Sequence, residues 1–237
     1  MRISFVIPTY NSVAWVSQAV QSVLEQGHKD VEVIVVDDAS QDATKDYLDW
    51  QAKQDARVRV IANAKNMGRS FSRNAGNAAA TGEYICVLDA DDLALPKRAG
   101  IVAAHFKNGG DFLYGSAVGI DACGRNLGEI GADVFNREKA FEKMENRIVH
   151  STVAYSKAFA HRFPYKGGDI ARLGIDDWTQ QVDAAAAGVK FEFVPNVLTC
   201  YRVLDAGVSQ TRSADEVRKF KIGYLQGMHA ESLQGAT

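Results

Sequence analysis

Three short polar clusters contain the residue types in this sequence that most often bind ligands or carry out chemistry. They are PTYN at 8–11, DDAS at 37–40 and DADD at 89–92. Each cluster follows a short run of apolar, β-rich residues, which is typical of a buried strand. Ligands of an open parallel sheet bind outside the carboxyl ends of its strands, so we expect the clusters to share one edge. A single cluster could be only a turn, but three together favour a binding site.

The cluster at 89–92 places three carboxylates, Asp89, Asp91 and Asp92, within four residues. Like charges so close together repel each other unless a cation neutralises them. Carboxylate oxygens suit Mg²⁺ or Mn²⁺, which take few protein ligands and add water and phosphate oxygens. The pattern therefore predicts a divalent cation that stabilises the charge on a departing diphosphate. The alternative is a turn in which Asp92 caps the helix that follows.

Two further features could hold a nucleotide. The carboxylate of Asp38, which we favour over Asp37, could accept hydrogen bonds from a base N–H or from ribose hydroxyls. A helix predicted to begin near Ser70 would attract phosphate at its N-terminus. Arg73 lies one turn into that helix, where its guanidinium could reach a phosphate or the base. The alternatives are a turn with Asp42 as a helix cap, and a surface ion pair for Arg73.

The elements that must position these clusters alternate along the first half of the chain. Runs of β-branched residues, helical spacing of apolar residues and capping residues define them. The predicted strands are 3–7, 31–36, 58–61 and 84–88, and the predicted helices are 13–24, 42–54, 70–80 and 96–107. Apolar strands that alternate with helices are typical of an α/β protein whose parallel sheet is covered on both faces.

After residue 110 the pattern becomes mixed. The predicted strands are 112–120, 148–155, 191–194 and 197–201, a hairpin-like region contains Gly119, Gly124 and Gly128, and the predicted helices are 136–145, 176–187 and 213 onward. We interpret 1–110 as a nucleotide-binding half and 111–237 as a smaller mixed region that completes one continuous domain.

Composition excludes several classes of protein. The chain has 237 residues and a formal net charge of −2, so no global basic field favours nucleic acid. Three scattered cysteines without a C-x-x-C pair argue against a disulfide framework and a zinc site, and they suit a reducing compartment. The apolar N-terminal run is too short for a signal peptide. No apolar stretch approaches the roughly 18 residues of a membrane span, so we expect a soluble, cytoplasmic protein.

Basic residues gather near the C-terminus, at Arg212, Arg218, Lys219 and Lys221. They leave open a peripheral contact with the inner face of a membrane. The alternative is an ordinary solvated helix face.

Four motifs in register resemble those of the family-two glycosyltransferases, which have the GT-A fold. The motifs are FVIPTYN at 5–11, VVDDAS at 35–40, NMG with RN over 66–74, and LDADD at 88–92. Order and spacing agree over 3–92 and, more loosely, to about 209. The resemblance implies a Rossmann-like sheet and inverting transfer of sugar from a UDP-sugar or other nucleotide sugar. A saccharide or lipid-linked saccharide would be the acceptor, as in bacterial surface polysaccharide synthesis.

The same resemblance assigns residues to the donor. Asp91 and Asp89 would lie at the diphosphate and at Mn²⁺ or Mg²⁺, with Asp91 as the direct ligand. The residues implied to contact the nucleotide are Pro8, Thr9, Tyr10, Asp38, Asn66, Arg73 and Asp89.

The family places its catalytic base in a Glu-Asp pair before a helix, and Asp176-Asp177 occupies that place here. Asp177 matches the base, whereas Asp176 stands where Glu is commoner. A helix start favours the ionised carboxylate, and the ordinary Asp pKa of about 3.9 leaves it able to accept a proton at neutral pH. The alternative is that both residues only cap a helix that packs through Trp178.

Five residues are weaker candidates for contact with the acceptor or the donor sugar. They are Asp176, Trp178, His150, Tyr201 and Arg202. Tyr201-Arg202, with Ser209 beyond, resembles a family segment that folds over the diphosphate. A structural histidine and core packing of the tryptophan are the alternatives for His150 and Trp178.

Two other functions compete with this interpretation. A sugar nucleotidyltransferase would normally carry a Gly-rich basic loop after the first strand, which 8–11 lacks. A non-catalytic nucleotide-sugar binding module would not need both Asp91 and Asp177. A P-loop enzyme and a dehydrogenase are disfavoured, because neither a Walker motif nor G-x-G-x-x-G occurs.

Overall fold

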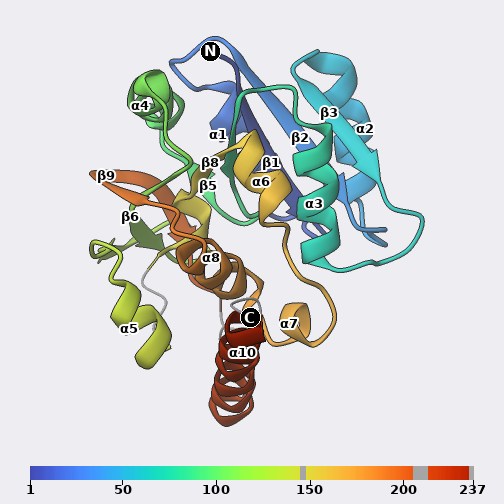
Figure 1. The fold of residues 1–237 in the computed structure, drawn as a ribbon. Helices are drawn as coiled ribbons and strands as arrows, with labels where there is room; N and C mark the ends of the chain where they lie inside the picture. Colours follow the sequence, from blue (N-terminus) through green and yellow to red (C-terminus); the bar gives the residue numbers. More distant parts are fainter. Residues whose placement is uncertain (145–147, 205–212, 235–237) are drawn as a thin grey trace.

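The computed structural model describes residues 1–144, 148–204 and 213–234. These residues form one nine-stranded sheet in the order β3-β2-β1-β4-β8-β6-β9-β5, with β7 paired to β6 (Figure 1). The strands are β1 Ile3–Thr9, β2 Val31–Asp37, β3 Val58–Ala62, β4 Tyr84–Val87, β5 Leu93–Ala94, β6 Phe112–Ile120, β7 Asn126–Ile130, β8 Ala154–Ser156 and β9 Phe191–Arg202.

The sheet is mostly parallel, as the sequence predicts. Strands β3, β2, β1 and β4 are parallel neighbours, and β6 runs parallel to β9. The antiparallel pairs involve β8, β7 and β5. Both β1 and β2 are buried along their whole length, which explains why they read as continuous apolar runs. The carboxyl ends of these strands therefore lie at one edge of the sheet.

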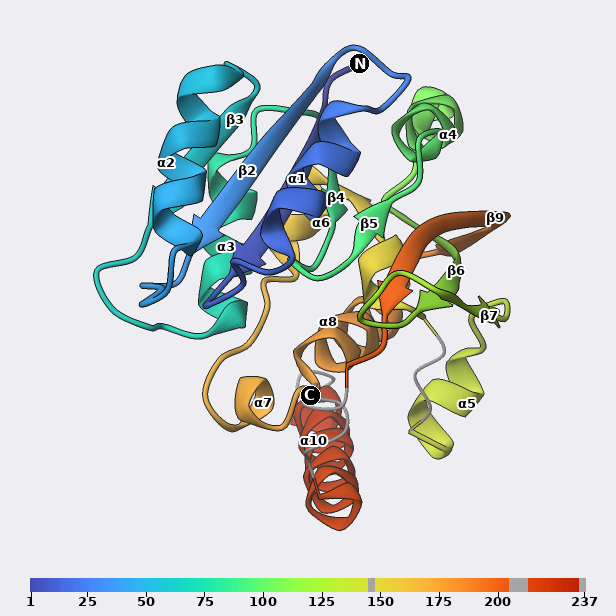
Figure 2. The ribbon, with the colours of Figure 1, turned by 180° about the vertical axis from the view of Figure 1, so that it is seen from behind.

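Helices cover both faces of this sheet (Figures 1 and 2). The α-helices are α1 Val16–Leu24, α2 Thr44–Gln54, α3 Arg69–Ala79, α4 Arg98–His105, α5 Arg137–Glu142, α6 Lys157–Arg162, α7 Asp169–Arg172, α8 Asp176–Ala186 and α10 Ala214–Gln234. Short 3₁₀ turns, η1 Phe106–Asn108 and η2 His150–Thr152, lie between them.

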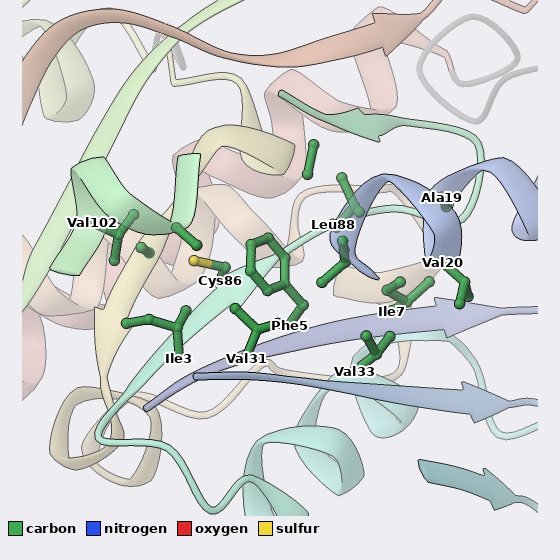
Figure 3. Close-up of a cluster of buried hydrophobic side chains, with 14 of the residues drawn as sticks. Ile3, Phe5, Ile7, Ala19, Val20, Val31, Val33, Cys86, Leu88 and Val102 are labelled. Carbon is green, nitrogen blue, oxygen red and sulfur yellow. The ribbon is translucent and has the colours of Figure 1, made fainter. Parts of the chain in front are cut away.

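Two buried clusters divide the core between the two faces. Figure 3 shows Ile3, Phe5 and Ile7 of β1 in one cluster, together with residues from α1 and α4. The alternate β1 residue Val6 joins the second cluster, to which α3, α6 and α8 contribute. The two-residue period of the strand thus assigns its side chains to opposite faces.

Helix α3 packs very closely on the sheet because its central residue there is glycine. A Cβ added to Gly76 would lie 2.4 Å from Val6 Cγ1 and 3.2 Å from Val36 Cγ2. Only glycine permits this approach, which holds α3 firmly against β1 and β2.

The predicted helix at 13–24 is wrong at its start, because α1 begins at Val16. The preceding backbone is tied to the loop after β2 instead. Ser12 N donates to Thr44 Oγ1 at 2.9 Å, and Val13 N donates to Asp42 Oδ2 at 3.2 Å. Asp42 therefore joins two loops at the sheet edge, which local propensity does not show.

The predicted strand at 148–155 is also wrong over most of its length. Its centre forms η2, and only Ala154–Ser156 pairs as β8. The buried guanidinium of Arg98 takes the carbonyls of Ser151 and Val153 as acceptors, at 2.6 and 3.0 Å. In contrast, the two strands predicted over 191–201 are the single strand β9, which has register shifts against β6.

Helix α10 packs against α8 and projects below it in both views (Figures 1 and 2). Lys221 is buried, and its Nζ donates to Met144 O at 2.9 Å and lies 4.5 Å from the Trp178 ring centre. The sequence suggested that Lys221 belongs to an exposed basic face. Its burial shows that it does not. Arg218 and Lys219 are exposed, and Arg212 lies outside the described residues. None of the helices within the described ranges is long and apolar enough to cross a membrane.

Candidate active site

A cleft of about 480 Å³ opens at the carboxyl ends of β1, β2 and β4. All three predicted polar clusters contribute to its walls. Its lining includes Pro8, Thr9, Tyr10, Asp38, Arg73, Asp89 and Asp91. Thr9 Oγ1 is buried and has no hydrogen-bond partner among the described residues. Asn66 is exposed and is not part of the cleft lining, so the structure separates it from the other residues predicted to contact the nucleotide.

The carboxylate of Asp38 is almost fully buried and organises the loop before α3. Asp38 Oδ1 accepts from Asn63 Nδ2 at 2.7 Å and from Met67 N at 2.8 Å, and Oδ2 accepts from Gly68 N at 2.7 Å. Gly68 has a φ of 85°, the left-handed region that favours glycine. Asp38 therefore shapes the cleft wall through its own hydrogen bonds. Asn63 carries no sequence signal of its own, because its contact with Asp38 depends on how the fold brings the two residues together.

Arg73 lines the cleft and forms hydrogen bonds with two acidic residues. Its Nη1 donates to Asp176 Oδ2 at 2.6 Å and its Nη2 donates to Asp89 Oδ1 at 2.7 Å. Its guanidinium also lies 5.3 Å from the ring centre of Tyr165. Burial alone would lower the pKa of Arg73, but the two carboxylates outweigh it and raise the pKa well above its usual value. The alternative of a surface ion pair is wrong, because Arg73 is only 5% exposed.

The acidic loop after β4 contains carboxylates with very different proton affinities. Burial opposes ionisation of Asp89, but Arg73 and His150 outweigh it and lower its pKa. Burial and the charge of Asp89 raise the pKa of Asp91 to about 6. Burial, Asp91 and Asp89 raise the pKa of Asp92 well above its usual value. The loop thus holds negative charge that protein cations only partly neutralise.

These carboxylates fit Mg²⁺ or Mn²⁺ by the chemistry of their oxygen atoms. Within the described ranges, no group of three or more His, Cys, Asp or Glu side chains is arranged to hold a metal ion. Asp89 and Asp91, the two carboxylates expected to hold the ion, both line the cleft. Hard divalent ions commonly use one or two carboxylates and complete their coordination with water and phosphate oxygens.

Arg202 lines the cleft and supports the acidic loop. Its Nε donates to Asp91 O at 2.8 Å, its Nη1 to Asp121 O at 3.0 Å, and its Nη2 to Gln18 Oε1 at 3.0 Å. Its guanidinium also lies 4.4 Å from the ring centre of Trp15. Every nitrogen of the guanidinium thus bonds to the protein, and Arg202 also lines the cleft. The neighbouring Tyr201 lines the cleft.

Helix α8 brings Asp176 and Asp177 to the same region. Asp176 is 2% exposed and pairs with Arg73 and with Arg69, so direct sugar contact does not fit its position. Asp177 is half-buried, and its Oδ1 accepts from Trp178 N at 2.8 Å. Trp178 is 1% exposed and packs in the cluster between α8 and α10, which leaves no face for stacking on a sugar.

His150 lies between the acidic loop and α8. Its Nε2 is 3.1 Å from Tyr165 Oη, and Tyr165 Oη is 3.1 Å from Tyr155 Oη. Burial and the charge of Arg73 lower the pKa of His150, although Asp177 acts in the opposite direction. Burial and Arg73 thus favour the neutral form of the His150 imidazole. The two tyrosines were not identified from the sequence, because no periodicity links them to the acidic motifs.

Comparisons with known proteins agree with this geometry. The sequence model described as "Glycosyl transferase family 2" matches residues 4–163. The succinoglycan biosynthesis protein ExoO of Rhizobium meliloti is 27% identical over 227 residues, covering 91% of this chain and 64% of ExoO.

Solved structures show the same architecture. S. aureus TarS 1-349 in complex with UDP superposes with a TM-score of 0.68 at 19% identity, covering 86% of this chain and 61% of that one. The mannosyltransferase PcManGT from Pyrobaculum calidifontis, in complex with GDP-Man and Mn²⁺, gives a TM-score of 0.65 at 17% identity. That match covers 87% of this chain and 58% of PcManGT, so the chain spans a little under two thirds of each of these proteins. The fold is the expected GT-A fold, and because the family match extends over more than half of its residues, the chain belongs to glycosyl transferase family 2.

Proposed function

We propose that this chain is an inverting glycosyltransferase that moves a sugar from a nucleoside-diphosphate sugar, with a UDP-sugar as the first candidate, to an acceptor hydroxyl. The observation that carries the proposal is the meeting of Asp89, Arg73 and Asp176, joined at 2.7 and 2.6 Å. This contact brings the acidic loop of the donor cleft next to the start of the helix that carries Asp177.

The donor side of the cleft suits a nucleoside diphosphate. Arg69 and Arg73 both line it, and they lie in the first turns of α3, whose N-terminus favours anions. Thr9 Oγ1 has a free hydrogen-bonding capacity among the described residues. TarS and PcManGT were solved with UDP and with GDP-Man plus Mn²⁺, which supports a nucleotide and a divalent cation here.

Asp89 and Asp91 would hold Mn²⁺ or Mg²⁺, which when bound supplies positive charge to the departing diphosphate. Arg73 adds a permanent positive charge at the cleft floor, since its pKa is held far above neutrality by its two carboxylate partners. The chain's own residues thus orient the diphosphate and offset its charge.

Asp177 is proposed as the general base. Its position at the start of α8 favours the ionised carboxylate. It accepts the proton of the acceptor hydroxyl while that oxygen bonds to the anomeric carbon on the face opposite the diphosphate. The carbon–oxygen bond to the diphosphate breaks in the same step, so the configuration at that carbon inverts.

The acceptor is proposed to be a saccharide or a lipid-linked saccharide in polysaccharide synthesis. ExoO carries a succinoglycan biosynthesis name, which supports this class. Peripheral contact with the inner face of a membrane through Arg218 and Lys219, which are exposed on α10, belongs to the same proposal.

The test is a donor-hydrolysis screen with UDP-, GDP- and dTDP-sugars in the presence of Mn²⁺ or Mg²⁺. We expect the wild-type protein to release a nucleoside diphosphate slowly from one class of donor and to lose this activity with EDTA. Pyrophosphate released from a nucleoside triphosphate and a sugar phosphate would favour the nucleotidyltransferase. Tight donor binding with no turnover, alone or with saccharide acceptors, would favour the binding module.

A further inference from the structure

We propose that Asp176 is a positioning residue that sets the place of Asp177 by anchoring α8 to the arginines of the donor cleft. The inference rests on the proposed function, because it concerns the distance between the base and the donor. It gives the first residue of the acidic pair its own task, separate from proton transfer.

Both carboxylate oxygens of Asp176 contact arginine side chains. Asp176 Oδ2 accepts from Arg73 Nη1 at 2.6 Å, and Oδ1 lies 3.2 Å from Arg69 Nε. The two arginines lie on α3, more than a hundred residues before α8, and Asp176 is 2% exposed. A carboxylate buried against two guanidinium groups cannot reach a substrate, but it can fix the first turn of its helix.

Helix α3 also forms hydrogen bonds with the segment before Asp177. Arg69 Nη2 donates to Ala171 O at 2.7 Å. Asn74 Nδ2 donates to Tyr165 O at 2.8 Å, and Tyr165 N donates to Asn74 Oδ1 at 2.9 Å. One helix of the donor half therefore holds the chain at 165, 171 and 176, and Asp177 follows directly after the last of these anchors.

The charges make this role separable from donor binding. Asp176 offsets positive charge on Arg69 and Arg73, which also line the donor cleft. Removal of its charge leaves both arginines more attractive to a diphosphate, while it releases the start of α8. The donor KM and the transfer kcat are therefore expected to change in different ways, which simple unfolding would not produce.

The experiment measures transfer by Asp176→Asn, which keeps the size of the side chain and removes its charge. We expect kcat to fall about 100-fold, the cost of a base displaced by about 1 Å, with an unchanged or lower donor KM. Asp176→Glu keeps the charge and is expected to recover part of the lost kcat.

The matched control is Asp183→Asn on the same helix. Asp183 pairs with Lys166 at 2.6 Å and accepts from Tyr224 Oη at 2.7 Å, so its loss weakens the packing of α8 without touching either arginine. This control is expected to lower the melting temperature and to leave kcat within about twofold of wild type, as for a surface change away from the site.

Two results would overturn the inference: a kcat for Asp176→Asn no lower than that of Asp183→Asn, or a raised donor KM with unchanged kcat. If Asp176→Asn does not fold, the same kinetic measurement on Asn74→Ala tests the inference, since this variant removes another anchor of the same segment. It must lower kcat at unchanged donor KM, and a wild-type kcat would contradict the inference. A wild-type protein inactive with every nucleotide sugar would instead count against the proposed function.

Discussion

The backbone N–H of Arg202 donates to Asp92 Oδ1 at 2.7 Å, across 110 positions of sequence. The same arginine bonds to the carbonyl of Asp91 through Nε at 2.8 Å. The end of β9 thereby fixes the position of the acidic loop after β4 through hydrogen bonds to Asp91 and Asp92. Because these contacts use both the backbone and the side chain of Arg202, the shape of the loop depends on a residue far outside its own motif.

We predict that Arg202→Lys loses about 2–4 kcal/mol of unfolding free energy, because lysine cannot replace several directed hydrogen bonds of a buried guanidinium. Metal-dependent nucleotide binding should weaken as well. Urea denaturation measures the first effect and titration calorimetry the second. Arg125→Lys is the control, since Arg125 is 80% exposed and pairs with Asp121. Equal stability of the two variants would contradict the supporting role.

Asp91→Asn is predicted to abolish Mn²⁺-dependent binding of UDP or GDP while leaving the fold intact. The amide keeps the shape of the side chain but is a poor ligand for a hard cation. Without metal, the melting temperature should stay the same or rise, since one of several repelling carboxylates is removed. Calorimetry with and without Mn²⁺ checks the binding. Unaltered Mn²⁺-dependent affinity would refute the assignment of Asp91.

The pH dependence of this binding follows from the pKa of Asp91, which burial and Asp89 raise to about 6. As the pH falls from 7 to 5, Asp91 becomes protonated in the folded protein, so Mn²⁺-dependent nucleotide affinity should fall about tenfold. The folded pKa lies above the ordinary Asp value, so the Asp91 carboxyl binds more protons in the folded protein than in the unfolded chain between about pH 4 and 6. Asp91 therefore adds unfolding free energy as the pH falls through that window.

Subtraction removes the contribution of groups whose pKa does not depend on Asp91. His150 has a lowered pKa and acts in the opposite direction, because its protonation favours the unfolded chain. The difference in unfolding free energy between wild type and Asp91→Asn, measured from pH 7 to 4 without metal, should follow Asp91 together with Asp92, whose pKa the charge of Asp91 raises. A difference independent of pH would contradict the raised pKa.

Asp177→Asn is predicted to reduce sugar transfer by at least about a hundredfold, since general base catalysis contributes factors of that order or more. Donor affinity should remain close to wild type, because Asp177 does not line the cleft at β1, β2 and β4. Steady-state kinetics with calorimetry of donor binding separate the two quantities. Full transfer activity in this variant would exclude Asp177 as the base.

Gly76→Ala is predicted to cost about 1–3 kcal/mol, the usual effect of overpacking a core. Its new methyl group would stand 2.4 Å from Val6 Cγ1, so α3 would have to move away from the sheet. Gly100→Ala on α4 is the matched control, since nothing lies within 4 Å of its added Cβ. It should add about 0.5–1 kcal/mol through helix propensity. Chemical denaturation of both variants checks the opposite signs.

The sequence was sufficient for most elements of the first half of the chain and for the edge of the site. Local features depend on residues that are close together in the sequence. They include the apolar runs of β1 and β2, the helices between the strands and the polar residues at the strand ends. Because parallel strands end at one edge, Thr9, Asp38 and Asp89 could be expected together before any coordinates, and they do line one cleft.

Tertiary structure alone decided which charges neutralise one another. Arg73 was expected to face a phosphate or a base, yet it also bonds to Asp89 and Asp176. Trp178 was a candidate for sugar contact, but core packing takes up its side chain, and Arg202 lines the cleft while it also supports the acidic loop. Contacts across a hundred residues depend on how strands and helices pack, and buried polar groups must find partners wherever packing places them. The spacing of residues along the chain therefore does not predict which polar groups become partners.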